Sequence, residues 1–311
     1  MAISASMVKE LREKTGAGMM DCKKALTNTD GDMDKAVEWL RENGLAKAEK
    51  KAGRIAAEGI VKTFISADGK NASMVEVNSE TDFVAKNDKF QDFVGDVVEQ
   101  INGSAAEDVE AFLAEAWAKD SSKTVKEELA SMVATIGENM NIRRFAKLSA
   151  DNGVVVDYIH AGGKIGVLIA AETDNTGDEV VECLKNVAMQ IAAMNPEYLS
   201  ADDVSEEYKE KEKKILLEQA KNDPKNAGKP ENIIEKMIIG RLNKELKEVC
   251  VTEQVYVKAE NKETVAKYVE SVAKAVGCNL KLTGFVRYET GEGLEKKEED
   301  FAAEVAAQMN A

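Results

Sequence analysis

Histidine and cysteine are scarce in this sequence. His160 is the only histidine among 311 residues, and the four cysteines are scattered without a Cys-x-x-Cys pair. Zinc sites use Cys and His ligands at short, regular spacings, so the sequence does not favour such a metal site. Scattered thiols are typical of reduced, mostly buried cysteines in a cytosolic protein. We therefore predict no metal ligands and no cofactor, and we expect free thiols at Cys22, Cys183, Cys250 and Cys278.

Positive charge is also in deficit. The chain has 42 Lys and Arg against 57 Asp and Glu, which gives a net charge of −15. Phosphate contacts dominate affinity for nucleic acids, so this balance argues against a direct nucleic-acid partner. The N-terminus lacks the basic start and apolar run of a signal peptide, and no segment approaches the roughly 20 apolar residues of a membrane-spanning helix. We expect a cytoplasmic protein with no membrane partner.

Motifs of known catalytic chemistry are lacking as well. The sequence contains no G-x-S-x-G elbow. Gly162-Gly163-Lys164 resembles a fragment of a P-loop but lacks the upstream glycine and the following Ser or Thr. A lone histidine after an apolar strand is usually structural or on the surface, so His160 is a weak candidate for a general base. We predict that the chain is not an enzyme.

The length and the apolar content of 44% suit two or three domains with real cores. Residues 1–54 predict a compact three-helix domain, because apolar residues recur at helical spacing in three segments. Asp32 is expected to cap the third helix, and Gly44 is expected to end it. Residues 45–58 are rich in Ala and Lys and predict a charged helical linker.

An internal repeat occupies the middle of the chain. Residues 69–101 and 163–193 each contain a Gly-Lys turn, an apolar strand, the tripeptide Glu-Thr-Asp and an amphipathic helix, and a β-rich run precedes each copy. A strand-turn-strand-helix unit buries one face of a sheet under one helix. The repeat therefore predicts an α+β fold with two related subdomains and antiparallel sheets, at 55–150 and at 151–204 with 250–288.

Helical patterns flank the second copy. A long helical stretch is expected at about 107–138. Ser205–Lys221 and Pro230–Val249 read as helices, and the Pro- and Gly-containing loop between them predicts an antiparallel hairpin over 205–249. Further strands are expected, and the C-terminal module 289–311 is expected to contain a helix. These last elements are predicted at Gln254–Ala259, Leu282–Tyr288 and Glu298–Met309.

Two adjacent pairs look unusual. Met19 and Met20 open a helix, where neighbouring side chains point about 100° apart, so either one forms an adaptable exposed contact or both are core. Phe83 follows Asp82 where a strand gives way to a helix. Locally, Asp82 reads as a helix cap and Phe83 as a core residue. However, the repeat sets 80–82 opposite 172–174, and the second copy then continues without an aromatic residue, so Phe83 reads as a specialisation of the first copy.

Five groups of motifs, spread from end to end, resemble the signatures of the elongation factor Ts family. Each motif is long and ungapped, so the resemblance is specific. The groups are Val8–Arg12 with Thr15–Leu26; Glu76–Asn78 with Thr81–Ala85; Ile136–Asn139 with Ile142–Arg144; His160 with Ile165–Leu168; and Gly284–Tyr288 with Gly291–Gly293 and Asp300–Ala306.

The resemblance implies a fold and a function. The fold would comprise a three-helix domain of the ubiquitin-associated type, a core of two related α+β subdomains, a helical hairpin and a C-terminal helix. The one partner would be the GTPase elongation factor Tu. The activity would be to accelerate release of GDP so that GTP can bind during translation elongation.

The resemblance also implies contact residues. Thr81, Asp82, Phe83 and Val84 would disturb the Mg²⁺ site of elongation factor Tu, with Phe83 inserted as a wedge and Asp82 positioning the tip. The other implied contacts are Arg12, Met19, Met20 and Lys23 on the nucleotide domain, Ile136 and Gly137 in the core contact, His160 facing the third domain, and Phe301 and Val305 returning to the nucleotide domain.

Two other function classes stay open at this point. The N-terminal helices alone are compatible with a ubiquitin-associated-like adaptor protein. A small-molecule enzyme that uses His160 is the weaker alternative. The helical hairpin is also a candidate for building a higher-order complex.

Overall fold

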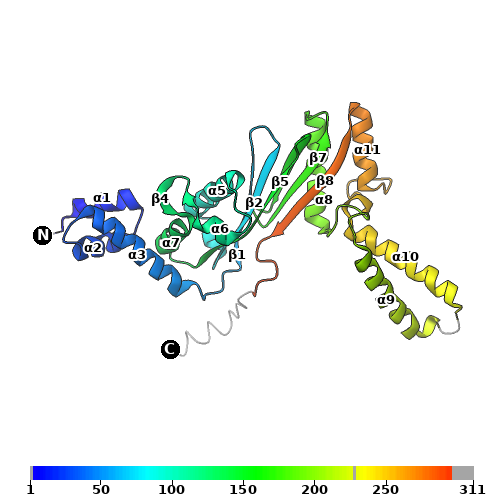
Figure 1. The fold of residues 1–311 in the computed structure, drawn as a ribbon, viewed down its shortest axis with the longest axis horizontal. Helices are drawn as coiled ribbons and strands as arrows, with labels where there is room; N and C mark the ends of the chain where they lie inside the picture. Colours follow the sequence, from blue (N-terminus) through cyan, green and yellow to red (C-terminus); the bar gives the residue numbers. More distant parts are fainter. Residues whose placement is uncertain (1–2, 227–228, 296–311) are drawn as a thin grey trace.

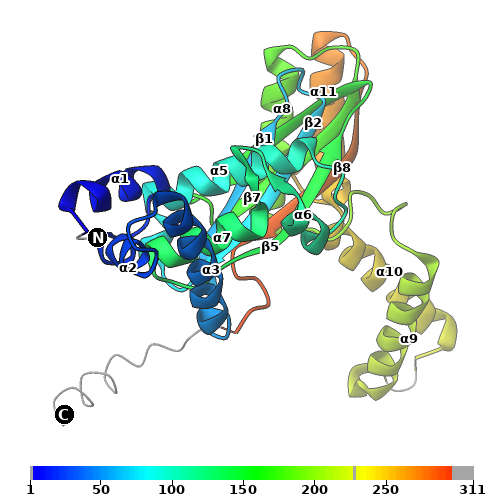
Figure 2. The same ribbon diagram turned by 60° about the vertical axis from the view of Figure 1, so that its left-hand side comes forward.

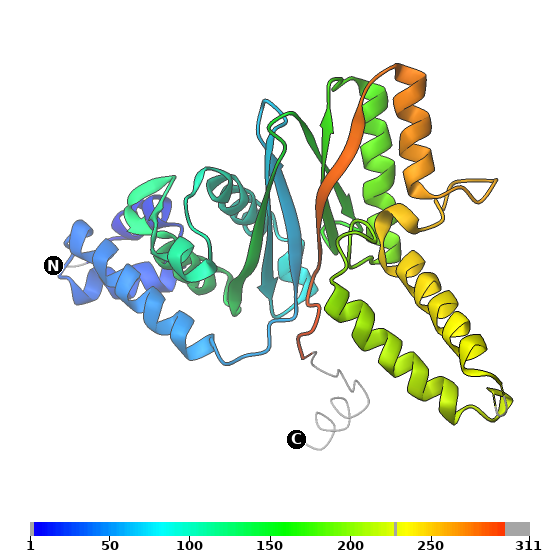
Figure 3. The same ribbon diagram turned by 45° about the vertical axis from the view of Figure 1, so that its right-hand side comes forward.

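Two three-stranded antiparallel sheets lie in the middle of the molecule, with helices on their outer sides (Figure 3). The computed structural model describes residues 3–226 and 229–295. The spatial order is β1-β2-β5 in the first sheet and β6-β7-β8 in the second. The predicted α+β class is confirmed. The strands are β1 (Glu58–Ile65), β2 (Asn71–Ser79), β5 (Met140–Ser149), β6 (Gly153–His160), β7 (Ile165–Thr173) and β8 (Leu280–Glu289).

The burial of the central strands follows from this layering. β2 and β7 are buried along most of their length, because each has helices against one face and the other sheet against the opposite face. Helix α5 (Asp88–Gly103) packs on the first sheet, and α8 (Asp178–Met194) packs on the second. Between the sheets, a third apolar cluster contains Met74 from β2 and Leu168 from β7.

Three helices form the N-terminal unit at one end of the molecule (Figure 1). Helix α1 (Ala5–Thr15) ends at Gly16, whose φ of 68° is readily adopted by glycine. Helix α2 (Met19–Asn28) follows, and α3 (Met33–Lys51) begins after Asp32. The Asp32 carboxylate accepts a hydrogen bond from the Lys35 N–H, so the predicted cap is confirmed. The buried core of this unit is Val8, Leu11, Cys22, Ala25, Leu26 and Ala36.

The prediction that Gly44 ends the third helix is wrong. Helix α3 continues through Gly44 to Lys51 because it packs against α7 (Val125–Ile136), and Figure 2 shows the two helices close together. Gly44 is buried at that contact, where a Cβ atom would lie 3.8 Å from the Ala130 carbonyl oxygen. The predicted helical linker at 45–58 is therefore only partly helical, since α3 ends at Lys51 and β1 begins at Glu58.

The internal repeat is present as two strand-turn-strand-helix units. In the first unit β1 and β2 pair and α5 covers them, and in the second β6 and β7 pair under α8. Each central strand also carries a pairing irregularity at the same place, after Glu76 in β2 and after Ala170 in β7. Two related antiparallel subdomains are thus confirmed.

The predicted alignment of the two Glu-Thr-Asp tripeptides is out of register by two residues. When β2 is aligned on β7, Ser79 lies opposite Thr173, and each hydroxyl donates to the carbonyl oxygen two residues later, at 3.0 Å in both copies. Thr81 therefore corresponds to Asn175. After this point the copies differ, because the first forms helix α4 (Asp82–Ala85), whereas the second proceeds directly to α8.

The long helix expected at 107–138 is wrong. Helix α6 (Val109–Ala114) stops after two turns, and a small hairpin separates it from α7. Trp117 in that hairpin is buried against Phe93 of α5, with ring centroids 5.9 Å apart. This contact makes the segment part of the first core. The strands of the hairpin are β3 (Ala116–Trp117) and β4 (Asp120–Thr124).

The predicted helical hairpin is confirmed and projects from the body (Figure 1). Its helices α9 (Glu206–Asn222) and α10 (Glu231–Val249) bury Leu216, Ile238 and Leu242 against each other. Other apolar side chains on these helices are exposed. Among them are Ile215 and Ile233.

The last described segment corrects one further expectation. Residues 254–259 contain no strand: a short 3-10 helix (Val251–Glu253) precedes them, and Val255 makes a single bridge to Thr264. Helix α11 (Val265–Val276), which the sequence reading missed, leads into β8, where the second expected strand is confirmed. The predicted helix at 298–309 lies outside the described residues.

Candidate functional site

A short helix forms an exposed corner between β2 and α5. Helix α4 is capped by Thr81, whose hydroxyl accepts a hydrogen bond from the Val84 N–H at 3.4 Å. Phe83 is 79% exposed, whereas Val84 and Ala85 are buried in the first core. The local reading of Asp82 as the cap and Phe83 as a core residue is therefore wrong. The fold anchors two residues of this turn and presents the aromatic ring to solvent.

Asp82 occupies the first turn of α4, where a negative charge suits the helix dipole. Its carboxylate accepts a hydrogen bond from Lys86 at 2.6 Å. This bond, together with the positive charge of Lys86 and that of Lys164, holds the pKa of Asp82 below its ordinary value. The corner therefore carries an ionised carboxylate beside an exposed aromatic ring at neutral pH.

The turn at the end of α7 lies beside this corner. Ile136 is the last residue of α7 and packs against the first core, and Gly137 caps the helix with φ 96°. The Lys51 ammonium group at the end of α3 donates to the Gly137 carbonyl oxygen. The following residue, Glu138, accepts hydrogen bonds from Thr81. The structure thus brings Ile136 and Gly137 next to the segment 81–84.

A second exposed apolar site lies on the N-terminal unit. Met19 and Met20 in the first turn of α2 are 60% and 65% exposed, so neither is a core residue. Lys23 lies one helical turn after Met19 and is exposed, as is Arg12 near the end of α1. Exposed methionines flanked by cations form an adaptable contact surface. The reading in which both methionines are buried is wrong.

His160 belongs to the second sheet, not to the corner. It ends β6 with an exposed side chain, and its Nδ1 lies 2.9 Å from the Tyr158 hydroxyl. The two rings are 5.9 Å apart, centroid to centroid. Ligand sites are usually concave and desolvate their residues, whereas this histidine is exposed to solvent beside a neighbouring tyrosine, so its geometry gives no support to an active site there.

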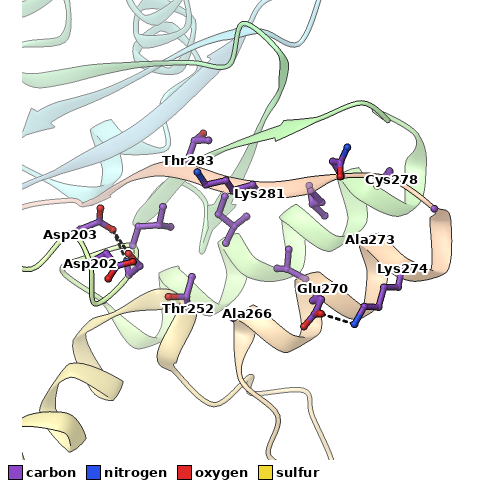
Figure 4. A pocket seen from close by; sticks show the side chains of 17 residues that line it. Asp202, Asp203, Thr252, Ala266, Glu270, Ala273, Lys274, Cys278, Lys281 and Thr283 are labelled. Atoms are coloured by element: carbon purple, nitrogen blue, oxygen red, sulfur yellow. Dashed lines mark hydrogen bonds and ion pairs between the residues drawn. The ribbon is translucent and has the colours of Figure 1, made fainter.

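A cavity of about 820 Å³ lies between α11 and β8 (Figure 4). Two of the three carboxylates that line it, Asp203 and Glu270, have hydrogen-bonding partners. Glu270 accepts a hydrogen bond from Lys274 at 2.6 Å, and Asp203 accepts two bonds from Ser200 at 2.8 Å. His160 does not line this cavity. Glu270 and Asp203 are therefore engaged by neighbouring residues rather than held free in the cavity.

A buried carboxylate lies behind the corner on β2. Glu76 is fully buried, and its oxygens accept from Arg143, Arg144 and Asn78 at 2.6–3.2 Å. Burial alone would raise the pKa of Glu76, but the Gly291 N–H and these side chains hold it below its ordinary value. This network joins Glu76 and Asn78 of one recognised motif to Arg143 and Arg144 of another.

Among residues 3–226 and 229–295, no group of three or more His, Cys, Asp or Glu side chains is arranged to hold a metal ion. Over the same residues, no helix combines the length and apolar character needed to span a bilayer.

The comparisons with known proteins span 99% of the chain. The family described as elongation factor TS matches residues 80–292, and that described as elongation factor Ts, mitochondrial, N-terminal matches residues 1–49. The elongation factor Ts of Clostridium novyi (strain NT) is 54% identical over 308 residues, which are 99% of each chain. Those of Clostridium botulinum (strain Okra / Type B1) and Clostridium tetani (strain Massachusetts / E88) are 53% identical over 99% of each chain.

The chain belongs to the elongation factor Ts family. It is therefore a nucleotide exchange factor for elongation factor Tu in translation elongation, and it binds elongation factor Tu. It is not a catalytic enzyme, so the reading that used His160 is set aside, as is the adaptor reading. Because elongation takes place in the bacterial cytoplasm, membership of the elongation factor Ts family also places the chain there.

Within this elongation factor Ts chain, the individual contact residues stay predictions. Phe301 and Val305 lie outside the described residues. Sequence reasoning missed the roles of Glu138, which accepts from Thr81, and of Glu80, which accepts from the Asn139 N–H. The only available signal was that Glu138 stands inside a recognised motif, Ile136–Asn139.

Proposed function

We propose that the corner Thr81–Val84 is the part of this exchange factor that opens the nucleotide site of elongation factor Tu. In this proposal Phe83 is the side chain that inserts into the partner. The observation that carries it is the exposure of Phe83 directly beside the buried Val84 on a capped turn. A rigid mount that presents one large apolar ring to water is suited to a wedge.

The energetics of such a wedge follow from linkage. An exchange factor must bind nucleotide-free elongation factor Tu more tightly than the GDP-bound form, and it then weakens GDP by the same factor. Burying a Phe side chain contributes about 1.5–3 kcal/mol, which corresponds to roughly a 10- to 100-fold change in an equilibrium constant. That contribution is available only when the partner has opened to receive the ring.

Asp82 would set the position of the tip and bring a negative charge to the phosphate-binding region of the partner. Mg²⁺ neutralises the phosphates of a bound nucleotide and keeps most of its water ligands. Disturbing that ion weakens the hold on GDP. The ionised state of Asp82, maintained by Lys86, supports this role.

The remaining contacts belong to the same proposal. Four residues of the N-terminal unit would bind the nucleotide domain beside the corner, and their exposure supports this contact. They are Arg12, Met19, Met20 and Lys23. His160 would face the third domain, and Ile136 and Gly137 would support the core contact. The domain bounds 1–54, 55–150, 151–204 with 250–288, 205–249 and 289–311 are kept as the working division of the chain, and self-association through the hairpin stays a prediction.

The test is Phe83→Ala, followed by stopped-flow release of a fluorescent GDP from elongation factor Tu. We expect the maximal release rate to fall about 10- to 100-fold, the factor expected for loss of the buried ring. Ile239→Ala is the matched control, because it removes a 52% exposed apolar side chain from the hairpin. An unchanged release rate with Phe83→Ala, at an unchanged melting temperature, would refute the wedge.

A further inference from the structure

We propose that Glu138 is a positioning residue for nucleotide exchange, which fixes Thr81 and through it the direction in which Phe83 points. The inference rests on the proposed function of Phe83 and adds a residue outside the corner that determines how well the corner works.

Glu138 holds Thr81 by two atoms at once. Its Oε2 accepts from the Thr81 backbone N–H at 3.0 Å, and its Oε1 accepts from the Thr81 hydroxyl at 2.7 Å. The same hydroxyl oxygen accepts the N–H of Val84 at the start of α4. One carboxylate therefore determines both the backbone and the side-chain rotamer of the residue that caps the helix.

The contact is reciprocal. Glu80, the residue before Thr81, accepts from the backbone N–H of Asn139 at 2.5 Å, the residue after Glu138. Glu80 also pairs with Arg54 at 3.4 Å. Glu80 and Thr81 are thus bonded to Asn139 and Glu138 of the α7–β5 turn, and each segment supplies one carboxylate and one backbone N–H.

The α7–β5 turn is also bonded to the end of α3 and to the segment that follows α3. Asn139 is buried and donates through Nδ2 to the Arg54 carbonyl oxygen at 2.8 Å. The Lys51 ammonium group bonds to the Gly137 carbonyl oxygen. The end of α3, which comes from the unit that exposes Met19 and Met20, is therefore held by the same turn as the corner. The Phe83 corner and the unit that carries Met19 and Met20 are thus both bonded to the α7–β5 turn.

This support matters because little else orients Phe83. Helix α4 has four residues, far fewer than an isolated helix needs to be stable in water. Val84 and Ala85 anchor one side of the turn, while the Phe83 ring is largely in solvent. Without Glu138 the cap residue loses its two charge-assisted bonds, and the ring samples directions that do not enter the partner.

The experiment measures GDP release at increasing concentrations of full-length chain, so that the maximal rate and the half-saturating concentration are obtained separately. We expect Glu138→Ala to lower the maximal rate about tenfold, the scale of a lost charge-assisted hydrogen bond, with a much smaller change in half-saturation. Glu138→Gln keeps the shape of the side chain but loses one acceptor oxygen. Its maximal rate should therefore lie between those of the parent chain and of Glu138→Ala. Glu115→Ala removes a carboxylate bonded to Ser104 in the same subdomain and should leave the rate unchanged.

Two variants of Thr81 provide a second, independent readout. Thr81→Ser keeps the hydroxyl that bonds to Glu138 and caps α4, so its maximal rate should exceed that of Thr81→Val. Thr81→Val has a similar shape without the hydroxyl and should resemble Glu138→Ala. Equal rates for the serine and valine variants would overturn the proposal, even if Glu138→Ala failed to fold.

The decisive step combines Glu138→Ala with Phe83→Ala. If Glu138 acts through the ring, its removal has no further effect once the ring is gone. A further tenfold loss in the double variant would overturn the positioning role while leaving the wedge intact. If Phe83→Ala alone has no effect on release, the wedge itself fails and the positioning role fails with it.

Discussion

The backbone N–H of Gly291 donates a 2.8 Å hydrogen bond to Oε1 of Glu76, although 215 positions separate the two residues. Arg144 bonds to the other oxygen of Glu76 at 2.6 Å and stacks over the Tyr288 ring at 4.1 Å. The first sheet, the end of β8 and the segment that follows β8 therefore meet at one buried charge.

Glu76→Gln is expected to lower the free energy of unfolding by about 3 kcal/mol, because breaking a buried ion pair leaves its partners uncompensated. Arg143 and Arg144 are partly exposed, and this keeps the loss at the lower end of the usual range. Urea titration followed by circular dichroism measures the change. Glu172→Gln alters an exposed carboxylate on β7 and should change stability little, and equal losses for both variants would argue against the network.

The stability of the parent chain should depend on pH through the same group. The pKa of Glu76 is lowered in the folded chain, so its contribution is complete above the ordinary Glu value of about 4.5. The contribution is lost as the pH falls through the lowered pKa. Urea midpoints measured between pH 7 and pH 3 should fall less steeply for Glu76→Gln than for the parent. Parallel curves would contradict this origin of acid sensitivity.

Gly291→Ala and Gly293→Ala form a matched pair, because both glycines have positive φ, at 73° and 72°. An alanine in the left-handed region costs about 1–2 kcal/mol, so both variants should lose that much stability. A Cβ on Gly291 would also lie 2.2 Å from the Ala57 carbonyl oxygen, whereas no atom of the described residues lies within 4 Å at Gly293. We expect Gly291→Ala to lose a further 1 kcal/mol or more, roughly the cost of overpacking, in the same urea assay.

Gly44→Ala should stabilise the chain by about 0.5–1 kcal/mol, because glycine inside a helix is less favourable than alanine by that amount. The new methyl group would meet the Ala130 oxygen at 3.8 Å, an ordinary contact. Gly240→Ala in α10 is the control with open space around it and should gain a similar amount. A loss at Gly44 alongside a gain at Gly240 would show that α3 and α7 pack too closely to accept a methyl group.

Thiol labelling of the folded chain should proceed fastest at Cys278. Burial raises the pKa of Cys183 and of Cys250 to about 11, and it also raises the pKa of Cys22. Cys278 is only partly buried. Ellman's reagent should therefore show one fast thiol per chain, which Cys278→Ser removes. More than one fast thiol in the parent would contradict the burial of the other three.

Sequence patterns predicted the repeat, the hairpin and the N-terminal helices, because each depends on local periodicity. They failed where tertiary packing decides. Gly44 is predicted to end the third helix, but α3 continues through Gly44 because it packs against α7. The alternating pattern at 254–259 resembled a strand, but Tyr256 turns inward and stacks on Tyr268 with ring centroids 4.1 Å apart. The sequence analysis did not predict β5. Its two adjacent arginines do not look like residues of a partly buried strand, because their bonds to Glu76 cannot be read from the sequence.

The candidate site shows the same division. The motif around Phe83 and its absence from the second copy are visible in the letters of the sequence. The sequence does not show that Phe83 is exposed. Asp82–Ala85 contains three apolar residues, and Phe83 is the exposed one because Val84 and Ala85 are the two that pack into the core. Nor can the sequence choose between Thr81 and Asp82 as the cap, since both residue types serve in that position.

Helix α4 has no counterpart in the second copy, where the chain passes from β7 to α8 with no helix between them. The connection between strand and covering helix can therefore be closed without it. Helix α4 is therefore an addition to the first copy that the repeated unit itself does not require.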